Sequence, residues 1–359
     1  MSNPDFARLT LDAETKSFQA YIGAFRKLWA GPLYRALRDE ARTLDHQDLA
    51  DYPAFEAELQ KRPKHQFFGW LEHNLQKMKY EGRWGIVQAA NAQRPALEAL
   101  VAAPVGGNRL TEDSSLKLPD YYEENDFHQH PGGLREDPLA AVIYRESATA
   151  SGGVVGKADL HARYVKALLG DETAKNVIDI GCGFGRGAFA FAASSPETTA
   201  VGVDLSGSCV RLSAHLAEDR PERERVRFVQ ADGVNVPFAD GSFDLFTSTM
   251  LLHEMPAAAI RELIAEAFRV LEPGGISAHL DFLPPPDNFL RALYLGHSDR
   301  NAEPFMRELA EMDMVAEHEK AGFTDVRIEP FAEDDQGLGE RWRLPWTIIR
   351  ARKPKDAVQ

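Results

Sequence analysis

The sequence predicts an α/β protein with a mainly parallel sheet in its C-terminal half and a helical domain before it. Three observations predict this class: two amphipathic runs near the N-terminus, a glycine-rich turn at 181–187, and seven short apolar runs that alternate with helix-length segments. Strands separated in this way form βαβ units. At 359 residues the chain has room for two domains.

Residues 1–110 are predicted to form a helical N-terminal domain. Aromatic and aliphatic residues recur there at spacings of three and four, as on one face of an amphipathic helix. They are Phe18, Tyr21, Ile22, Phe25, Leu28 and Trp29 in a first run, and Phe67, Phe68, Trp70, Leu71, Leu75 and Met78 in a second. Such stripes are far more often core or interface than a cofactor site, so this domain is expected to cover a pocket or to form a dimer interface.

Residues 111–157 are predicted to form a connecting segment that covers an active site. Gly and Pro are frequent over 104–133, and irregular segments of this length in compact proteins are usually functional or disordered. This one is too aromatic for plain disorder. Its candidates for contact with a substrate are Tyr122, His128 and Tyr144.

Residues 158–353 are predicted to form the sheet-containing domain. It opens with a helix over 157–169. The predicted strands are 176–180, 199–205, 226–232, 243–249, 275–282, 326–331 and 345–352.

A glycine-rich turn follows the first of these strands. Residues 177–187 read VIDIGCGFGRG, with Gly181, Gly183 and Gly185 at every second position. Glycines let the backbone approach a ligand closely, and the start of the next helix attracts a carboxylate or phosphate. The strict dinucleotide fingerprint fails because Arg186 stands where its last glycine would be. A relaxed form that allows alanine fits two residues later, so glycine spacing alone leaves a dinucleotide open.

Acidic residues end the next two predicted strands. Asp204 can accept hydrogen bonds from both hydroxyls of a ribose, and such charge-assisted bonds are worth about 1.5–3 kcal/mol each. Asp232 can accept from an adenine amine, while Gly233 lets a flat ring lie close. Three strand ends in series would thus hold one nucleoside ligand at the carboxyl edge of the sheet.

These motifs resemble the class I S-adenosylmethionine-dependent methyltransferases, and especially the small-molecule branch related to the quinone-biosynthesis enzymes (methyltransferase type 11). The resembling stretches are VIDIGCGFGRG, GVDLS, QADGVNVPFADGSFDLF and RVLEPGGI, in this order within 160–352. The resemblance implies a Rossmann-like seven-stranded sheet whose last strand is antiparallel, and S-adenosylmethionine as the cofactor. It also implies a set of cofactor-binding residues: Asp179, Gly181, Gly183 and Gly185 at the methionine end, Asp204 and Leu205 at the ribose, Asp232 and Gly233 at the adenine, and Met250 beside the methyl group.

The catalytic candidates follow the fourth predicted strand. Methyl transfer is an in-line displacement in which positioning supplies about 7–11 kcal/mol. A general base adds roughly 10²–10⁴-fold where the acceptor must lose a proton. His253, a residue type that titrates near neutrality, is the candidate base, together with Glu254. The alternative makes both residues the polar start of the next helix.

Further substrate candidates lie on and after the fifth predicted strand. His279 and Asp281 share one side of it and could face the pocket, although residues two apart share a side of any strand. The insertion over 287–314 resembles, in its position, the family's substrate lid. Its candidates are Phe289, Tyr294, His297 and Phe305. The alternative is a helix pair packed on the N-terminal domain.

The predicted function is transfer of a methyl group from S-adenosylmethionine to an oxygen or carbon of a small, flat or hydrophobic organic acceptor. Methylation of adenine or glutamine nitrogens is disfavoured, because TSTMLLHE stands where such enzymes often carry N/D-P-P-Y/F. Methylation of nitrogen or sulfur in a small metabolite stays open, as does a catalytically idle module that binds the cofactor for regulation. A Rossmann oxidoreductase is disfavoured by QADG and LEPGG.

Composition narrows the partners and the location. The chain has 41 Lys and Arg against 55 Asp and Glu, a net charge of −14 with scattered basic residues, which disfavours nucleic acid. No run approaches the roughly 18 apolar residues of a spanning helix, and the start does not read as a signal peptide. Cys182 and Cys209 form no metal-ligand pair, and His128 and His130 have no evident third ligand. We therefore expect a cytoplasmic protein with no metal and no membrane contact, and a homodimer as one role for the N-terminal stripes.

Overall fold

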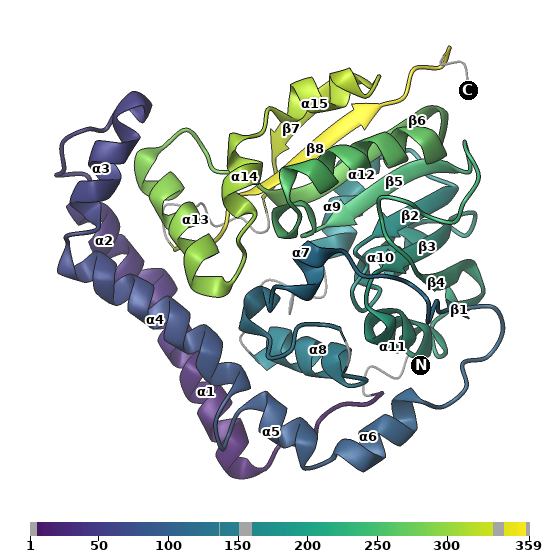
Figure 1. Cartoon of the computed structure of the whole chain (residues 1–359), viewed down its shortest axis with the longest axis horizontal. Coiled ribbons are helices and arrows are strands. Elements are labelled where there is room, and N and C mark those ends of the chain that lie inside the picture. The colour runs from purple at the N-terminus through teal and green to yellow at the C-terminus, as the bar shows by residue number, and fades with distance from the viewer. Residues whose placement is uncertain (1–5, 136, 151–159, 333–340, 357–359) are drawn as a thin grey trace.

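A computed structural model describes residues 6–135, 137–150, 160–332 and 341–356, and structural statements below concern these parts. Its centre is an eight-stranded sheet in the order β1-β4-β3-β2-β5-β6-β8-β7 (Figure 1). The strands are Leu110–Thr111 (β1), Asn176–Ile180 (β2), Thr199–Asp204 (β3), Val226–Gln230 (β4), Phe243–Thr249 (β5), Leu271–Phe282 (β6), Thr324–Pro330 (β7) and Trp346–Arg352 (β8). Every neighbouring pair is parallel except the two pairs that contain β8.

This arrangement confirms the predicted α/β class and the antiparallel last strand, and it corrects the strand count from seven to eight. The extra strand is β1, a two-residue strand from the end of the predicted N-terminal domain and the start of the connecting segment. It forms the edge of the sheet and pairs with β4 through Leu110 and Phe228. Hydrophobic periodicity cannot reveal a strand of two residues, because the pattern needs at least four.

Helices cover both faces of the sheet and form an arm beside it (Figure 1). The longer helices before the glycine turn are α1 (Ala13–Leu28), α2 (Tyr34–Ala41), α3 (Tyr52–Leu59), α4 (Pro63–Tyr80), α5 (Ile86–Asn91), α6 (Arg94–Val101), α8 (Ala140–Ala150) and α9 (Leu160–Leu169). Those after it are α10 (Arg186–Ser194), α11 (Gly207–Ala217), α12 (Ala257–Val270), α13 (Asn288–Asn301), α14 (Met306–Glu311) and α15 (Met314–Lys320). Short turns lie at η1 (Trp29–Leu33), η2 (Leu49–Asp51), α7 (Asp120–Glu123), η3 (Phe127–Gln129), η5 (Arg223–Arg225) and η6 (Leu252–Glu254).

Alternate side chains of the strands feed two cores, one on each face of the sheet. In β2, Val177 packs with α9, α10 and α11, whereas Ile178 packs with α12, α14 and α15. Both residues are fully buried. Strands buried on both faces explain why the sequence shows continuous apolar runs rather than alternation.

The N-terminal helices pack on the rest of the chain in two places. Tyr34 and Phe55 of α2 and α3 join a core with Phe289 of α13, while α5, α6 and α8 share a core with α11. Between these places α1 and α4 form a long arm, whose cluster includes Ile22 and Leu75 (Figure 1). The division into domains at 110 and 157 stays a prediction.

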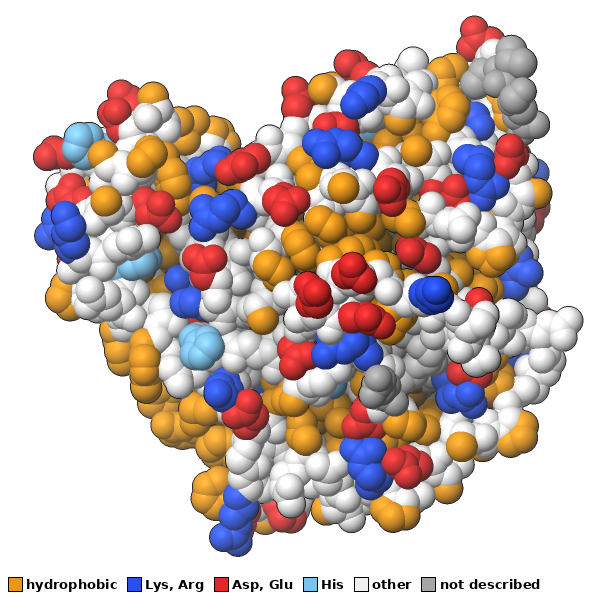
Figure 2. Space-filling model, in the orientation of Figure 1, with side chains coloured by type: hydrophobic (Ala, Val, Ile, Leu, Met, Phe, Trp, Pro, Cys, Tyr) orange, Lys and Arg blue, Asp and Glu red, His pale blue; other side chains and the backbone are white. Residues whose placement is uncertain are grey.

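The surface bears on the expected partners. On the face in Figure 2, Lys and Arg side chains lie among Asp and Glu side chains rather than in one basic field. Tyr21, Phe67 and Trp70, which the stripes placed in a core or interface, are 48%, 48% and 59% exposed. The homodimer therefore stays a prediction. Among the described helices, none has the length and apolar character that crossing a membrane requires.

Candidate active site

The glycine turn after β2 depends on glycine at two positions. Gly181 has a φ of +65°, and a Cβ there would lie 2.7 Å from Cδ1 of Leu251. Gly185 has a φ of +82°, and a Cβ there would lie 2.9 Å from Phe189. Residues with side chains rarely adopt this left-handed backbone. The turn therefore brings bare backbone to the carboxyl edge of the sheet, directly before α10.

Two carboxylates, one buried and one partly buried, hold this turn. Oδ2 of Asp179 accepts a hydrogen bond from the amide of Ala188, at 2.8 Å. Oδ2 of Asp204 accepts from the amide of Gly183 at 2.8 Å, and Oδ1 accepts from Ser206 at 2.9 Å. Burial raises the pKa of Asp179 to about 7 and that of Asp204 to about 6. Asp204 keeps lone pairs for a further donor, because a carboxylate accepts about four hydrogen bonds.

The next strand ends complete one wall of a pocket. Leu205, Asp232 and Gly233 all line it. A Cβ on Gly233 would lie 2.5 Å from Cγ2 of Ile180, so only glycine fits against Ile180 at this position. Met250, just after β5, also lines the pocket and has a φ of +57°, a strained conformation for a residue with a side chain.

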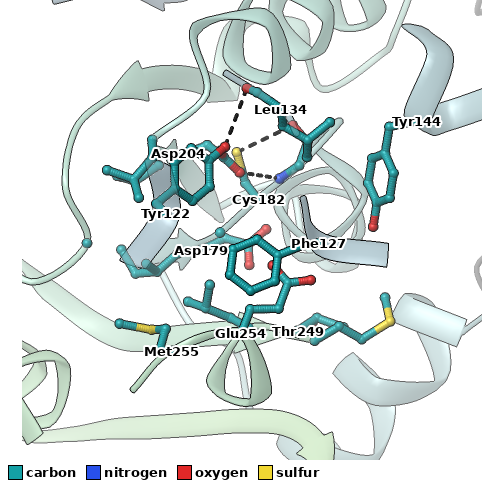
Figure 3. A pocket seen from close by; sticks show the side chains of 18 of the residues that line it. Tyr122, Phe127, Leu134, Tyr144, Asp179, Cys182, Asp204, Thr249, Glu254 and Met255 are labelled. Carbon is teal, nitrogen blue, oxygen red and sulfur yellow. Dashed lines mark hydrogen bonds between the residues drawn. The ribbon is translucent and has the colours of Figure 1, made fainter. Parts of the chain in front are cut away.

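The connecting segment closes this pocket from the other side (Figure 3). Tyr122 and Phe127 project into it opposite Asp179 and Asp204, and the hydroxyl of Tyr122 donates to the carbonyl of Leu134. The remaining cavity has a volume of about 130 Å³. Ligand sites usually measure about 300–1,000 Å³. The side chains of the connecting segment thus fill part of the space that a nucleoside needs.

The pocket lining fits the expected cofactor, S-adenosylmethionine. Asp204 and Asp232 are both partly buried carboxylates that line the pocket, where they can accept hydrogen bonds from ribose hydroxyls and from an adenine amine. Oγ1 of Thr249 is buried at the pocket with no hydrogen-bond partner in the described chain. It is free to bond a polar group of the methionine end.

A second, larger cavity adjoins this pocket, and we call it the acceptor cavity. Its volume is about 830 Å³, and it shares His128, Tyr144 and Met250 with the pocket. Its other walls come from α1, α4, η6 and α13, and from the segment before β8. Its lining combines charged and polar side chains with six aromatic ones: Trp29, Tyr80, Tyr144, Phe282, Trp342 and Trp346.

A histidine–aspartate pair lies where the two cavities meet. Nδ1 of His253 lies 2.6 Å from Oδ1 of Asp281, and Oδ2 of Asp281 accepts from the amides of Leu251 and Leu252 at 2.9 and 2.7 Å. Both side chains are buried, and His253 lines the acceptor cavity. Because Asp281 accepts the Nδ1 proton, Nε2 keeps the lone pair. Burial lowers the pKa of His253, but Asp281 and the nearby carboxylates outweigh it and raise the pKa above 6.5.

His128 has a different role from His253. Its Nε2 lies 2.6 Å from Glu254 and its Nδ1 lies 2.8 Å from Glu303. Although burial opposes charge, the two carboxylates raise the pKa of His128 to about 10. His128 is therefore a cation that ties the connecting segment to η6 and to the segment after α13. Glu254, a predicted catalytic residue, is engaged in this ion pair.

Two of the residues predicted to contact the substrate lie away from both cavities. His279 is fully buried between Ser248 and Ser277, which hydrogen bond to its two ring nitrogens. Tyr294 is fully buried and donates to the carbonyl of Phe282. Neither lines the pocket or the acceptor cavity. Asp281 contacts His253 and lines neither cavity, whereas Tyr122, His128 and Tyr144 do line the pocket.

Several buried charges at the acceptor cavity were not predicted. Glu72 of α4 pairs with His297 at 2.6 Å and with Arg300 at 2.5 Å, and Glu303 lies 3.6 Å from His297. Lys79 of α4 and Arg26 of α1 also line this cavity. The sequence of α4 does contain a feature that indicates polar residues on its buried side. Glu72, Gln76 and Lys79 fall at helical spacing within the apolar stripe.

Neither metal nor disulfide chemistry is indicated. Among the described residues, no group of three or more His, Cys, Asp or Glu side chains is arranged to hold a metal ion. Cys182 and Cys209 are both buried as free thiols.

Comparisons with known proteins agree with this site. The family of methyltransferase domains matches residues 177–275. A ubiquinone/menaquinone biosynthesis C-methyltransferase of Dinoroseobacter shibae is 33% identical over 35% of this chain and 50% of its own length. An uncharacterized methyltransferase of Synechocystis sp. is 32% identical over 44% of this chain and 71% of its own. The 27-O-demethylrifamycin SV methyltransferase of Amycolatopsis mediterranei is 33% identical over 39% and 49%.

The match thus spans about half the length of the first and third of these relatives, and more than two thirds of the second. The family match at 177–275 includes the glycine turn, Asp204 and Asp232. The predicted family and cofactor are confirmed: the chain belongs to the class I S-adenosylmethionine-dependent methyltransferases.

Proposed function

We propose that this protein transfers a methyl group from S-adenosylmethionine to an oxygen or an acidic carbon of a small, hydrophobic organic acceptor. The acceptor would lie in the acceptor cavity. The observation that carries the proposal is the buried His253–Asp281 pair beside Met250, where the cofactor pocket and the acceptor cavity meet. A base of this kind serves acceptors that must lose a proton.

The bound cofactor supplies an electrophilic methyl group, and the residues of this chain prepare the acceptor. Nε2 of His253 takes the proton of a hydroxyl or acidic carbon. The resulting imidazolium is stabilised by Asp281 at Nδ1. Oε2 of Glu303 and Oε1 of Glu254 lie 3.9 and 4.0 Å from Nε2. That Glu303 oxygen has no hydrogen-bond partner within the described chain, so it is free to face the new charge.

The shape of the cavities supports a small and hydrophobic acceptor. Six aromatic side chains lie in the acceptor cavity among charged and polar ones, and its volume suits a ligand of drug-like size. Because His253 and Asp281 are buried, little water reaches the base. A dry site favours methyl transfer to a positioned acceptor over reaction with water. Relatives named for carbon and for oxygen methylation are both compatible with a base.

The test is a screen for methyl transfer with tritiated S-adenosylmethionine against phenols, catechols, 1,3-diketones, amines and thiols. We expect transfer to phenols, catechols or diketones. We expect His253→Ala to lower turnover by roughly 10²–10⁴-fold and to change the dissociation constant of S-adenosylhomocysteine much less.

A matched control is His318→Ala. His318 is also fully buried and bonds one acceptor, the carbonyl of Met314, but it lies on α15 away from both cavities. This variant should lose stability and keep its turnover. Transfer confined to amines or thiols, with full activity in His253→Ala, would refute the proposal. Cofactor binding with no transfer to any class would favour a regulatory module.

A further inference from the structure

Lys79 and Arg26 line the acceptor cavity, and neither forms an ion pair with a carboxylate of the described residues. Lys79 is only 6% exposed, and its ammonium makes no hydrogen bond or ion pair with any described residue. Its nearest recorded partner is the ring of Tyr80, whose centroid lies 4.7 Å away. Arg26 donates to the neutral Oε1 of Gln76 at 2.8 Å, and its Nε is buried without a partner. Unpaired buried charges are rare, because each costs several kcal/mol of desolvation.

The two cations also lie near one another. Burial lowers the pKa of Lys79 and the charge of Arg26 lowers it further, although Glu303 acts in the opposite direction. Burial also lowers the pKa of Arg26, and the charge of Glu72 offsets this only in part. An anion between them would reverse both effects, since an opposite charge favours the charged form.

The carboxylates of the cavity are already matched by other groups. Glu72 pairs with His297 and Arg300, and Glu303 pairs with His128 and His297. The two carboxylates that line the cavity thus have cationic partners of their own, whereas Lys79 and Arg26 have no ion pair with a carboxylate among the described residues. The whole chain has a net charge of −14, so two neighbouring cations without carboxylate partners differ from its overall acidic character.

The cations share a wall with the base end of the cavity. Gln76, which accepts from Arg26, donates through Nε2 to the carbonyl of His128 at 2.8 Å. His128 in turn borders both the cofactor pocket and the acceptor cavity. A ligand that reaches from Lys79 and Arg26 towards His253 therefore stays within one cavity.

We propose that the methyl acceptor is an aromatic or similarly flat carboxylic acid, whose carboxylate binds Lys79 and Arg26 while its reactive end lies at His253. This inference rests on the proposed function. The aromatic lining holds the flat body of the ligand. The two cations fix its direction, because charge-assisted hydrogen bonds at one end orient the other end.

The test is calorimetric titration of the full chain, loaded with S-adenosylhomocysteine, with 2-naphthoate and with its neutral analogue 2-naphthamide. We expect 2-naphthoate to bind roughly 10- to 100-fold more tightly, the range for one charge-assisted hydrogen bond. Lys79→Met and Arg26→Gln should each reduce that preference, and Lys79→Arg should keep it. Lys79→Gln provides a second variant should Lys79→Met fold poorly.

Lys77→Met is the matched control. Lys77 lies on the same helix, but its side chain is exposed and pairs with Glu81, so this variant should keep the full preference for 2-naphthoate. Absence of 2-naphthoate binding, equal binding of the two probes, or a preference that survives both Lys79→Met and Arg26→Gln would overturn the inference. Tighter binding of 2-naphthyl phosphate than of 2-naphthoate would overturn the carboxylate assignment.

The binding test can fail separately from the proposed function. His253→Ala should lose methyl transfer and still prefer 2-naphthoate, because the base does not touch the carboxylate. If His253 is needed for transfer but the wild type shows no preference, only the carboxylate inference falls. If no acceptor is methylated although 2-naphthoate is preferred, the proposed function falls.

Discussion

Replacement of Asp204 by alanine removes the acceptor that we assign to the ribose of the cofactor. Each oxygen of Asp204 already accepts one backbone N–H, from Gly183 and from Ser206. About two acceptor sites remain for the two ribose hydroxyls. At about 1.5–3 kcal/mol for each charge-assisted bond, their loss amounts to about 3–6 kcal/mol. That corresponds to roughly 10²–10⁴-fold weaker binding of S-adenosylhomocysteine.

Calorimetric titration with S-adenosylhomocysteine measures this effect, and pH supplies a second readout. Because the pKa of Asp204 is raised to about 6 by burial, the wild-type affinity should fall as the pH falls through about 6. Protonation removes the charge that the hydroxyls bind. The same pH dependence should be absent from Asp204→Ala.

Asp244→Ala is the matched control for this experiment. Asp244 also accepts two backbone N–H groups, from Lys175 at 2.6 Å and Asn176 at 2.9 Å, but near the amino end of β5. This variant should lose stability and keep its affinity. An unchanged dissociation constant in Asp204→Ala, or an equal loss in Asp244→Ala, would refute the ribose assignment.

Two further predictions follow from the buried ion pairs. Asp281→Asn should lower kcat and move the acidic limb of the pH–rate profile to lower pH. The reason is that burial then lowers the pKa of His253 without the charge of Asp281, which helps to raise it above 6.5. A pH–rate profile that keeps its position would contradict this role of Asp281. Glu72→Ala should lower the free energy of unfolding by about 3–5 kcal/mol, measured in urea, because it leaves His297 and Arg300 without their carboxylate. A loss below about 1 kcal/mol would show that water replaces the carboxylate.

The cofactor pocket was predictable because its signals are local. Glycines at 181, 183 and 185 mark a turn that only glycine tolerates at several positions. Asp204 and Asp232 each end a buried strand, and the carboxyl ends of parallel strands meet at one edge. The lining of the cofactor pocket can therefore be predicted from local sequence features, without knowledge of tertiary contacts.

The base was predictable only in parts. The sequence singled out His253 and Asp281 separately, but their hydrogen bond joins residues 28 apart through the turn η6 and strand β6. His279 and Asp281 are two residues apart, so the sequence predicts that they share one side of the strand. This spacing does not tell how far each residue lies from the carboxyl end of the strand. In the structure His279 lies deeper, between Ser248 and Ser277.

The acceptor cavity was not predictable, because it arises where distant helices meet. Lys79 and Arg26 share it only because α1 packs beside α4, and Glu303 faces it only because α13 packs on α4. The two-residue strand β1 was missed for the opposite reason, since it is too short to carry a pattern. Charged residues at helical spacing within an apolar stripe, as at Glu72 and Lys79, are the sequence feature that would have indicated the cavity.

The most direct test of the central claim is methyl transfer from ¹³C-methyl S-adenosylmethionine, with NMR identification of the atom that receives the methyl group. The acceptors are hydroxylated naphthoates and their amides. The account predicts a methyl ether or a methylated acidic carbon on the naphthoates, formed by the wild type and almost lost in His253→Ala. A methyl group on nitrogen, or equal product from the wild type and His253→Ala, would contradict it.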